Sequence, residues 1–294
     1  MRLTVPFDLD ATLCCGQVFR WEKRGEWWFG VVGARALKVR QSGETLEFSG
    51  IDEAVITCYF GLNHHLQRIS HEINKDDHIS KALHEFWGLR IIQQDPWECL
   101  ISFICATYKS VAAIRQMLFR LSARFGEKVV IEGNDFYAFP TAERLAKASV
   151  QELETCGLGY RAKYVLETSK MVLAGGCDFA TLKKLPYKEA KKTLRQFPGV
   201  GLKVADCMLL FGLGKLEAFP VDVWVKRILL RYYAGHFPAD FVKKLSSQKG
   251  FSDADYERLC GFGKEYFGAF AGYAQEYLYH YERLTAKLKK ADVE

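Results

Sequence analysis

Short apolar stretches separated by turn residues fill the first fifty positions of the chain. The segments 27–32, 36–40 and 45–48 are rich in aromatic and β-branched residues, and glycine-containing turns separate them. Segments of this kind are typical of strands that pack one face against a core. The pattern therefore predicts a small antiparallel sheet at the start of the chain.

From residue 52 onward the periodicity is helical. Asp95 and Pro96 suit the N-cap and the first position of a helix, and the apolar residues that follow, up to Cys105, recur on one face. Ser110 suits the cap of a second helix that ends near Gly126. Further helices are expected at 141–148, 150–155, 161–174, 187–196, 202–213, 222–233 and 263–288.

These elements together predict an α+β fold in two parts. Residues 1–88 are expected to form a small N-terminal antiparallel β-sheet domain with flanking helices. Residues 89–294 are expected to form a mostly α-helical body. No internal repeat and no long flexible linker divides the chain.

Composition narrows the class of protein and the compartment. Hydrophobic residues make up 49% and charged residues 26% of the chain, and no apolar run approaches the roughly 20 residues that a membrane span needs. The first residues lack the apolar stretch of a secretion signal, and the nine cysteines include no Cys-x-x-Cys pair. We therefore expect a cytoplasmic monomer with reduced thiols, no membrane partner and no required metal.

The segment 194–206, Leu-Arg-Gln-Phe-Pro-Gly-Val-Gly-Leu-Lys-Val-Ala-Asp, is the most informative part of the chain. It predicts a helix, a tight hairpin and a second helix. Gly199 and Gly201 can adopt positive φ angles, and with Val200 between them they can bring backbone N–H groups close to an anion. The positive end of the second helix adds to this attraction. Residues 191–231 hold eight Lys or Arg against three Asp or Glu, so a DNA phosphate fits this surface.

Lys203 opens the second helix, and Asp222 follows it in the sequence Phe-Pro-Val-Asp-Val. A neutral amine held beside a DNA backbone can attack a sugar carbon, and a carboxylate can stabilise the positive charge that develops there. Pro-Gly-x-Gly turns are common, however, and a lysine in a first helical turn is often only solvated. A non-catalytic helix-hairpin-helix DNA-binding module is therefore an alternative from a different class of protein.

Several separated motifs give the chain a clear family resemblance. It resembles the helix-hairpin-helix superfamily of DNA glycosylases and, more narrowly, the 8-oxoguanine DNA glycosylase/AP lyases. The matching segments are 16–21, 94–105, 158–164, 198–207 and 271–275.

The resemblance implies a bifunctional DNA repair enzyme that flips 8-oxoguanine out of duplex DNA. Lys203 is expected to displace the base through a Schiff base and then nick the strand by β-elimination. Asp222 is expected to stabilise the charge on the sugar. The implied partner is double-stranded DNA that contains 8-oxoguanine or an abasic site, which in a prokaryote would place the protein on the nucleoid. A glycosylase of the same fold that removes another damaged base remains an alternative.

The resemblance also implies a pocket for the flipped base. A backbone carbonyl at Gly16 would accept the N7 hydrogen that distinguishes 8-oxoguanine from guanine, and Phe19 would pack behind this turn. Cys207 and Tyr279 match the two positions that sandwich the base. Gln275, one helical turn before Tyr279, could hydrogen-bond the Watson–Crick edge.

Three residues match positions that touch the gap left in the duplex. Tyr160 resembles the aromatic wedge beside the opposite base, and Arg161 the neighbouring contact to that base. Tyr108 stands where the better-known members carry an asparagine, and Ala113 stands where they carry an arginine that reads the opposite cytosine. Losing both removes hydrogen bonds worth roughly 1–3 kcal/mol of discrimination each, so we expect a relaxed choice of opposite base. The departure resembles bacterial members of the family.

Two further expectations do not come from a side-chain pattern. The resemblance allows a structural monovalent or divalent cation on main-chain carbonyls of Arg195, Phe197 and Val200, and implies no other cofactor. Trp224 follows Asp222 by two residues, and the sequence leaves open whether it touches substrate or core.

Overall fold

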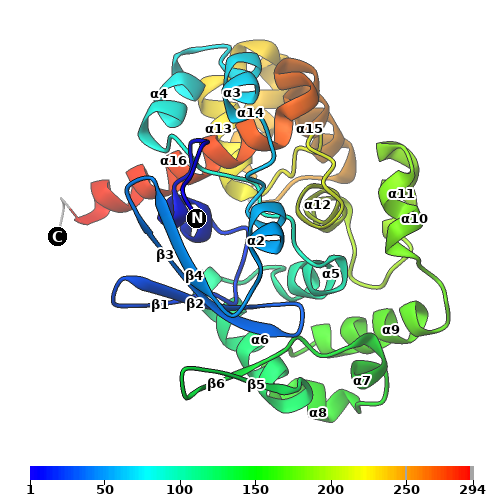
Figure 1. Cartoon of the computed structure of the whole chain (residues 1–294). Coiled ribbons are helices and arrows are strands. Elements are labelled where there is room, and N and C mark those ends of the chain that lie inside the picture. Colours follow the sequence, from blue (N-terminus) through cyan, green and yellow to red (C-terminus); the bar gives the residue numbers. More distant parts are fainter. Residues whose placement is uncertain (249, 292–294) are drawn as a thin grey trace.

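The computed structural model describes residues 1–248 and 250–291, with side chains up to residue 286, so the last three residues of the predicted body lie outside it. A four-stranded antiparallel sheet lies to one side of a helical body (Figure 1). Its strands follow one another in the order of the sequence. They are β1 (Glu22–Arg24), β2 (Trp27–Val32), β3 (Arg35–Ser42) and β4 (Thr45–Ser49). The three predicted strands are confirmed, and the short β1 adds an edge strand.

Apolar residues are buried on both faces of the sheet, with Phe29, Val31 and Ala36 packed beside Ile131 on one face. The other face packs into a larger buried cluster. Trp28 pairs with Val39, and Val39 pairs with Phe48, so their side chains share that face. Helices close the sheet and lead into the body. These helices are α1 (Leu9–Cys14), α2 (Glu53–Tyr59), α3 (Leu66–Ile73) and α4 (Asp77–Glu85). The placement of a domain boundary at residue 88 stays a prediction.

The body is helical, as the periodicity predicted. Its first helices are α5 (Pro96–Cys105), α6 (Val111–Phe125), α7 (Ala142–Ala146), α8 (Val150–Thr155), α9 (Arg161–Leu173) and α10 (Phe179–Lys184). The hairpin and the C-terminal helices are α11 (Tyr187–Leu194), α12 (Leu202–Cys207), α13 (Val223–Tyr232), α14 (Ala239–Ser247), α15 (Asp253–Phe267) and α16 (Ala271–Ala291). Short π or 3₁₀ turns are η1 (Met208–Gly212), η2 (Ala234–His236) and η3 (Gly268–Phe270).

The predicted N-cap residues of two helices are confirmed. The side chain of Asp95 accepts a hydrogen bond from the backbone N–H of Glu98 at 2.9 Å, with Pro96 in the first turn. Ser110 accepts from the N–H of Ala113 at 3.3 Å at the start of α6. Helix α5 therefore begins where the sequence predicted, and it runs almost wholly buried through the body beside α12 and η1.

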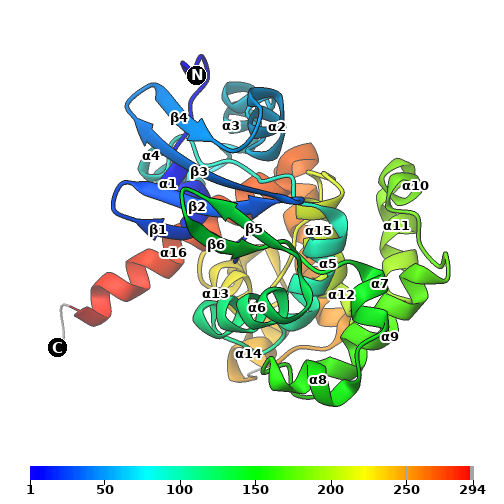
Figure 2. The same cartoon turned by 60° about the horizontal axis from the view of Figure 1, so that its bottom comes forward.

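A second, two-stranded sheet interrupts the expected helical region. Strands β5 (Lys128–Ile131) and β6 (Asn134–Tyr137) form a hairpin beside β2 and β3 (Figure 2). Its turn residues Glu132 and Gly133 have φ angles of 49° and 74°, which is the geometry of a hairpin turn that favours glycine. The prediction of unbroken helical structure after residue 52 is wrong here. The short hairpin gives a weaker sequence signal than the helical periodicity of the segments on either side of it.

The helix predicted at 263–288 is in fact two helices. Helix α15 ends at Phe267, and Gly268 has a φ of 70° that no helical residue adopts. The chain turns through η3 and starts α16 at Ala271. After this break α16 packs against α4, α13 and α15. Among the described residues, no helix is long and apolar enough to cross a membrane.

Candidate active site

The hairpin joins α11 to α12 through residues 195–201. Gly199 has a φ of 80°, and a Cβ there would lie 2.8 Å from the ring of Tyr164 on α9, so only glycine fits. Gly201 is the N-cap of α12 with a φ of −81°, so the expectation of a positive φ at this position is wrong. The N–H of Val200 donates to the carbonyl of Phe197 at 3.1 Å and closes the turn.

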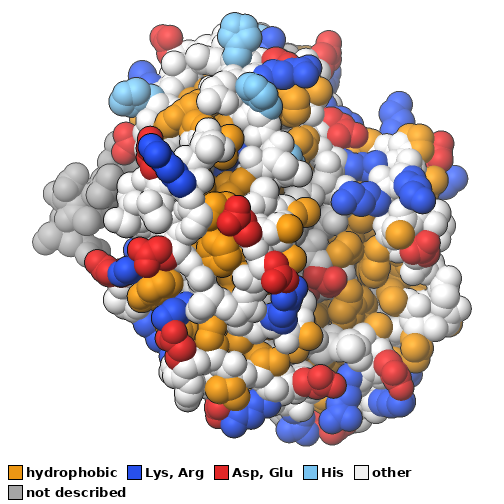
Figure 3. All heavy atoms as spheres, in the orientation of Figure 1, with side chains coloured by type: hydrophobic (Ala, Val, Ile, Leu, Met, Phe, Trp, Pro, Cys, Tyr) orange, Lys and Arg blue, Asp and Glu red, His pale blue; other side chains and the backbone are white. Residues whose placement is uncertain are grey.

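Lysine and arginine side chains gather beside the hairpin. Figure 3 shows them over α10 and α11, where Lys183, Lys184, Lys188 and Lys192 are exposed. A basic surface of this kind attracts a polyanion over several ångströms. It lies on the same side of the molecule as the hairpin turn.

A small open pocket of about 60 Å³ lies beside α12, the helix that follows the hairpin. Five separate elements meet there: the turn after α1, helix α5, helix α12 with η1, the N-cap of α13 and helix α16. Six of the predicted residues line this pocket, namely Gly16, Lys203, Cys207, Asp222, Gln275 and Tyr279. Four further residues line it that the sequence did not single out: Phe103, Phe211, Pro220 and Glu276.

Lys203 lies in the first turn of α12 with its amine over an aromatic ring. Its Nζ is 5.1 Å from the centroid of Phe103. Phe103 is stacked against Phe211 at 5.5 Å, and Phe19 meets its edge at 5.7 Å. Phe19 therefore packs against Phe103, which lines the pocket, and does not line the pocket itself. Phe103 belongs to the apolar stretch of α5, but only the tertiary packing shows that its ring faces Lys203.

Asp222 is the N-cap of α13. One carboxylate oxygen, Oδ1, accepts hydrogen bonds from the backbone N–H groups of Trp224 and Val225, both at 2.8 Å. Burial raises the pKa of Asp222, and the two N–H donors and the Lys203 ammonium oppose that rise only in part. Trp224 is half-exposed, with the guanidinium of Arg227 5.3 Å from its ring centroid, and does not line the pocket.

The opposite wall is built by α16 and the turn after α1. Gly16 has a φ of 106°, and a Cβ there would lie 2.8 Å from Arg283 and 3.5 Å from the ring of Tyr279. Arg283 holds this turn by donating to the carbonyl of Cys14 and to the hydroxyl of Tyr279. Across the pocket on α12, burial raises the pKa of the Cys207 thiol to about 12, so this side chain is neutral near pH 7.

Glu276 is the one ionisable group among the four pocket residues that the sequence did not single out. Its side chain is 3% exposed, and burial raises the pKa of its carboxyl group to about 7. A glutamate on a helix is usually solvated, and the only available signal was its position beside Gln275. Within the described part of the chain, no group of three or more His, Cys, Asp or Glu side chains could hold a metal ion.

Three predicted DNA-contacting residues lie outside this pocket on two adjacent turns. Tyr108 is 92% exposed with a φ of 54°, and Tyr160 is 54% exposed. Arg161 is 3% exposed and donates to the carbonyls of Thr107 and Leu158, with its guanidinium 4.3 Å from the ring centroid of Tyr160. Arg161 therefore ties the turn that carries Tyr108 to the turn that carries Tyr160.

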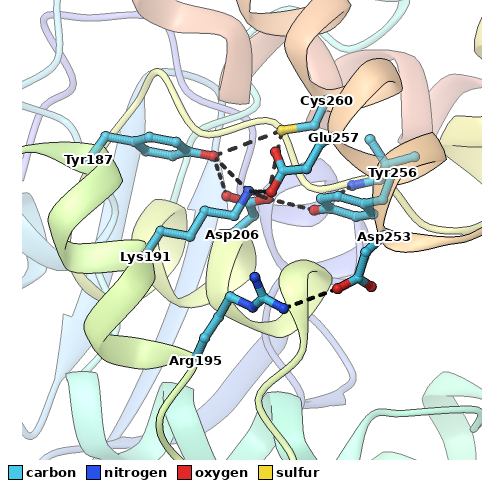
Figure 4. Close-up of polar contacts among 9 residues, drawn as sticks. Tyr187, Lys191, Arg195, Asp206, Asp253, Tyr256, Glu257 and Cys260 are labelled. Atoms are coloured by element: carbon cyan, nitrogen blue, oxygen red, sulfur yellow. Dashed lines mark hydrogen bonds and ion pairs between the residues drawn. The ribbon is translucent and has the colours of Figure 1, made fainter.

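A buried polar cluster links α12 to two neighbouring helices (Figure 4). Asp206, between Lys203 and Cys207, is fully buried and receives hydrogen bonds from the hydroxyl groups of Tyr187 and Tyr256. Lys191 on α11 lies 3.0 Å from Asp206 and 3.0 Å from Glu257. Burial disfavours the charged form of Lys191, but these two carboxylates outweigh it and raise its pKa. The cluster joins α11, α12 and α15.

Replacing Lys191 by alanine is expected to destabilise the protein. The change leaves the Asp206 carboxylate buried without its ammonium partner, which typically costs about 3–5 kcal/mol. Denaturant unfolding measures the loss, and Lys192→Ala, an exposed change on the same helix, should stay within about 0.5 kcal/mol of the parent protein. A loss below about 1 kcal/mol for Lys191→Ala would show that the tyrosine hydroxyls alone satisfy Asp206.

Comparison with known proteins places this architecture in a family. Residues 2–100 match the family model of the 8-oxoguanine DNA glycosylase N-terminal domain, and residues 101–246 match that of the HhH-GPD superfamily of base excision DNA repair proteins. The probable N-glycosylase/DNA lyase of Methanothermobacter thermautotrophicus is 31% identical over 74% of this chain and 70% of its own length. The N-glycosylase/DNA lyase of Saccharomyces cerevisiae is 35% identical over 66% of this chain, but only 57% of its own length is matched.

A solved structure is similar over almost the whole chain. The Clostridium acetobutylicum 8-oxoguanine glycosylase/lyase, in complex with double-stranded DNA containing cytosine opposite 8-oxoguanine, superposes with a TM-score of 0.85 at 31% identity. The match covers 96% of this chain and 93% of that protein. The similarity therefore includes both the sheet and the helical body.

Proposed function

The chain belongs to the 8-oxoguanine N-glycosylase/DNA lyase family of helix-hairpin-helix base excision repair enzymes, and on that basis we propose that Lys203 is the nucleophile of both its reactions. The observation that carries this proposal is the meeting of Lys203, in the helix that follows the hairpin, and Asp222 in one small pocket. A lysine that only bound solvent would not need to share a pocket with a carboxylate and the residues that could hold a base.

The chemistry follows from a neutral Lys203 amine. Its lone pair forms a bond to C1′ of the flipped nucleotide, and the glycosidic bond breaks with its electron pair leaving on the base, which takes up a proton. Asp222 stabilises the positive charge that develops on the sugar as this bond breaks. The sugar ring opens to a Schiff base with Lys203. Loss of a C2′ proton then expels the 3′ phosphate by β-elimination and cuts the strand.

The substrate is double-stranded DNA that carries 8-oxoguanine or an abasic site. In the pocket the flipped base lies between Cys207 and Tyr279, with the carbonyl of Gly16 as acceptor for the N7 hydrogen of the lesion and Gln275 at its Watson–Crick edge. The support for this arrangement is that all four residues line the same pocket as Lys203. A neutral thiol at Cys207 suits a face that packs against a base.

The DNA backbone follows the hairpin and the basic surface beside it. The backbone of Gly199, Val200 and Gly201 holds a phosphate next to Lys203. Main-chain carbonyls of Arg195, Phe197 and Val200 suit a structural cation, since neutral oxygen ligands are those that alkali and alkaline-earth ions accept. Tyr108 and Tyr160 enter the gap left in the duplex, which agrees with their exposure.

Borohydride trapping on a duplex with one 8-oxoguanine tests the proposal, because the reductant makes a Schiff base permanent. We expect a covalent complex with the lesion duplex and none with the same duplex carrying guanine. The exposed Tyr108 and the small Ala113 offer no planar donor pair for cytosine, so trapping yields opposite C, T, G and A should agree within about fivefold, a difference of roughly 1 kcal/mol. Absence of any complex would contradict the Schiff base, and a steep preference for cytosine would contradict the relaxed specificity alone.

A further inference from the structure

Two neighbouring side chains on α16 that line the base pocket each carry an oxygen without a hydrogen-bond partner among the described residues. Both Gln275 and Glu276 line the pocket, and they are 5% and 3% exposed. Within the described part of the chain, the Oε1 atoms of Gln275 and Glu276 are both buried and have no hydrogen-bond partner. Buried acceptors left unpaired cost free energy, so two of them in one pocket indicate a ligand that supplies hydrogens.

The charged and titratable groups around Glu276 come from every element that packs on it. They are the Cys15 thiol after α1, Lys203 and Cys207 on α12, Asp222 at the start of α13, and Tyr279 and Arg283 on α16. Cys15 donates its hydrogen to the carbonyl of Thr12, and Arg283 donates to the carbonyl of Cys14. The Cys15 side chain also interacts with the Glu276 carboxyl group and opposes the rise of its pKa, but the Oε1 atom of Glu276 has no hydrogen-bond partner among the residues that the structure describes. Because burial raises the pKa of Glu276 to about 7, its carboxylate form grows as the pH rises through neutrality.

The bases differ in how many hydrogens they can offer to such a pair of acceptors. A guanine-type edge carries two adjacent donors, the N1 hydrogen and the 2-amino group. An adenine-type edge carries a lone pair at N1 and no 2-amino group. A pocket with two free oxygens side by side therefore suits a guanine-derived lesion and repels an adenine-derived one.

We propose that Glu276 is a further specificity-determining residue, whose carboxylate joins the Gln275 amide oxygen in accepting the N1 and 2-amino hydrogens of the flipped base. This inference rests on the proposed function, since it assumes that a base enters the pocket beside Lys203. It assigns Glu276 a contact with the base and no contact with the sugar. Cleavage of abasic DNA, which has no base to contact, should therefore not depend on it.

Single-turnover excision of 8-oxoguanine and of 8-oxoadenine tests the proposal with two variants. Glu276→Met keeps the length of the side chain and removes both carboxylate oxygens, so excision of 8-oxoguanine should fall about 10- to 100-fold. Excision of 8-oxoadenine should not fall, because one of the oxygens that repel it is gone. Glu276→Gln keeps one acceptor and should lose less. In the parent protein, 8-oxoguanine excision relative to abasic cleavage should rise with pH through about 7, and in Glu276→Gln this dependence should be absent.

Abasic-site cleavage and melting temperature control for folding. Both variants should cut abasic DNA at the parent rate, and Glu276→Gln should melt at a higher temperature above pH 7, because burial makes the ionised carboxylate unfavourable in the free protein. Glu265→Gln, an exposed change on α15, is the matched control and should alter neither ratio.

Different results would contradict the role of Glu276 and the proposed function. An unchanged ratio of 8-oxoguanine to 8-oxoadenine excision in both variants would overturn the role of Glu276, as would an equal loss of abasic cleavage. A parent protein that cuts abasic DNA but excises no 8-oxoguanine would overturn the proposed function, and this inference with it.

Discussion

Lys203→Gln is expected to abolish base excision and strand cleavage together. Glutamine has a similar length but no basic amine, so neither the bond to C1′ nor the Schiff base can form. Removal of an enzyme nucleophile typically lowers the rate by about 10⁴-fold or more, and no borohydride complex should be trapped. Single-turnover assays on 8-oxoguanine and on abasic duplexes measure the two reactions separately.

The folded structure should tolerate this change well. The contact of the Lys203 ammonium with the Phe103 ring, at 5.1 Å, is worth about 0.5–2 kcal/mol. The rest of α12 is held by the Asp206 cluster. Binding to lesion duplex should persist, and Lys243→Gln, an exposed change on α14, should keep full activity. Base excision that survives in Lys203→Gln without strand cleavage would mean that water displaces the base directly.

Much of this fold could be predicted because its signals are local. Asp95 and Ser110 cap the helices that follow them, and such caps depend on residues only three positions apart. The break at Gly268 was missed because the apolar periodicity continues through it. A single glycine with positive φ is a weak signal against a long periodic stretch.

Some residues of the pocket could be predicted from local sequence signals, and others depend on tertiary packing. Lys203 and Cys207 are one helical turn apart, so their common face followed from spacing alone. Phe103 and Glu276 line the same pocket from helices more than 150 positions apart in the sequence. Their part in the pocket depends on how α5, α12 and α16 pack, which no periodicity within one helix specifies.

Asp222→Asn is expected to separate the charge of this residue from its capping role. The oxygen that caps α13 accepts from two backbone N–H groups at 2.8 Å, and an asparagine oxygen can accept in the same way. The charge that stabilises the developing positive sugar is lost, however. Loss of one such electrostatic contact typically lowers the rate by about 10²- to 10³-fold.

The stability of Asp222→Asn should equal or exceed that of the parent at neutral pH. Burial raises the pKa of Asp222, so the folded protein binds this proton more tightly than the unfolded chain does, and the ionised carboxylate works against folding above that pKa. Asp222→Ala loses the cap as well and should cost about 1 kcal/mol. Melting temperature and single-turnover excision, measured on both variants, test the separation. An asparagine variant that melts as low as the alanine variant would show that the carboxylate charge itself holds α13, and the loss of activity would then reflect structure rather than catalysis.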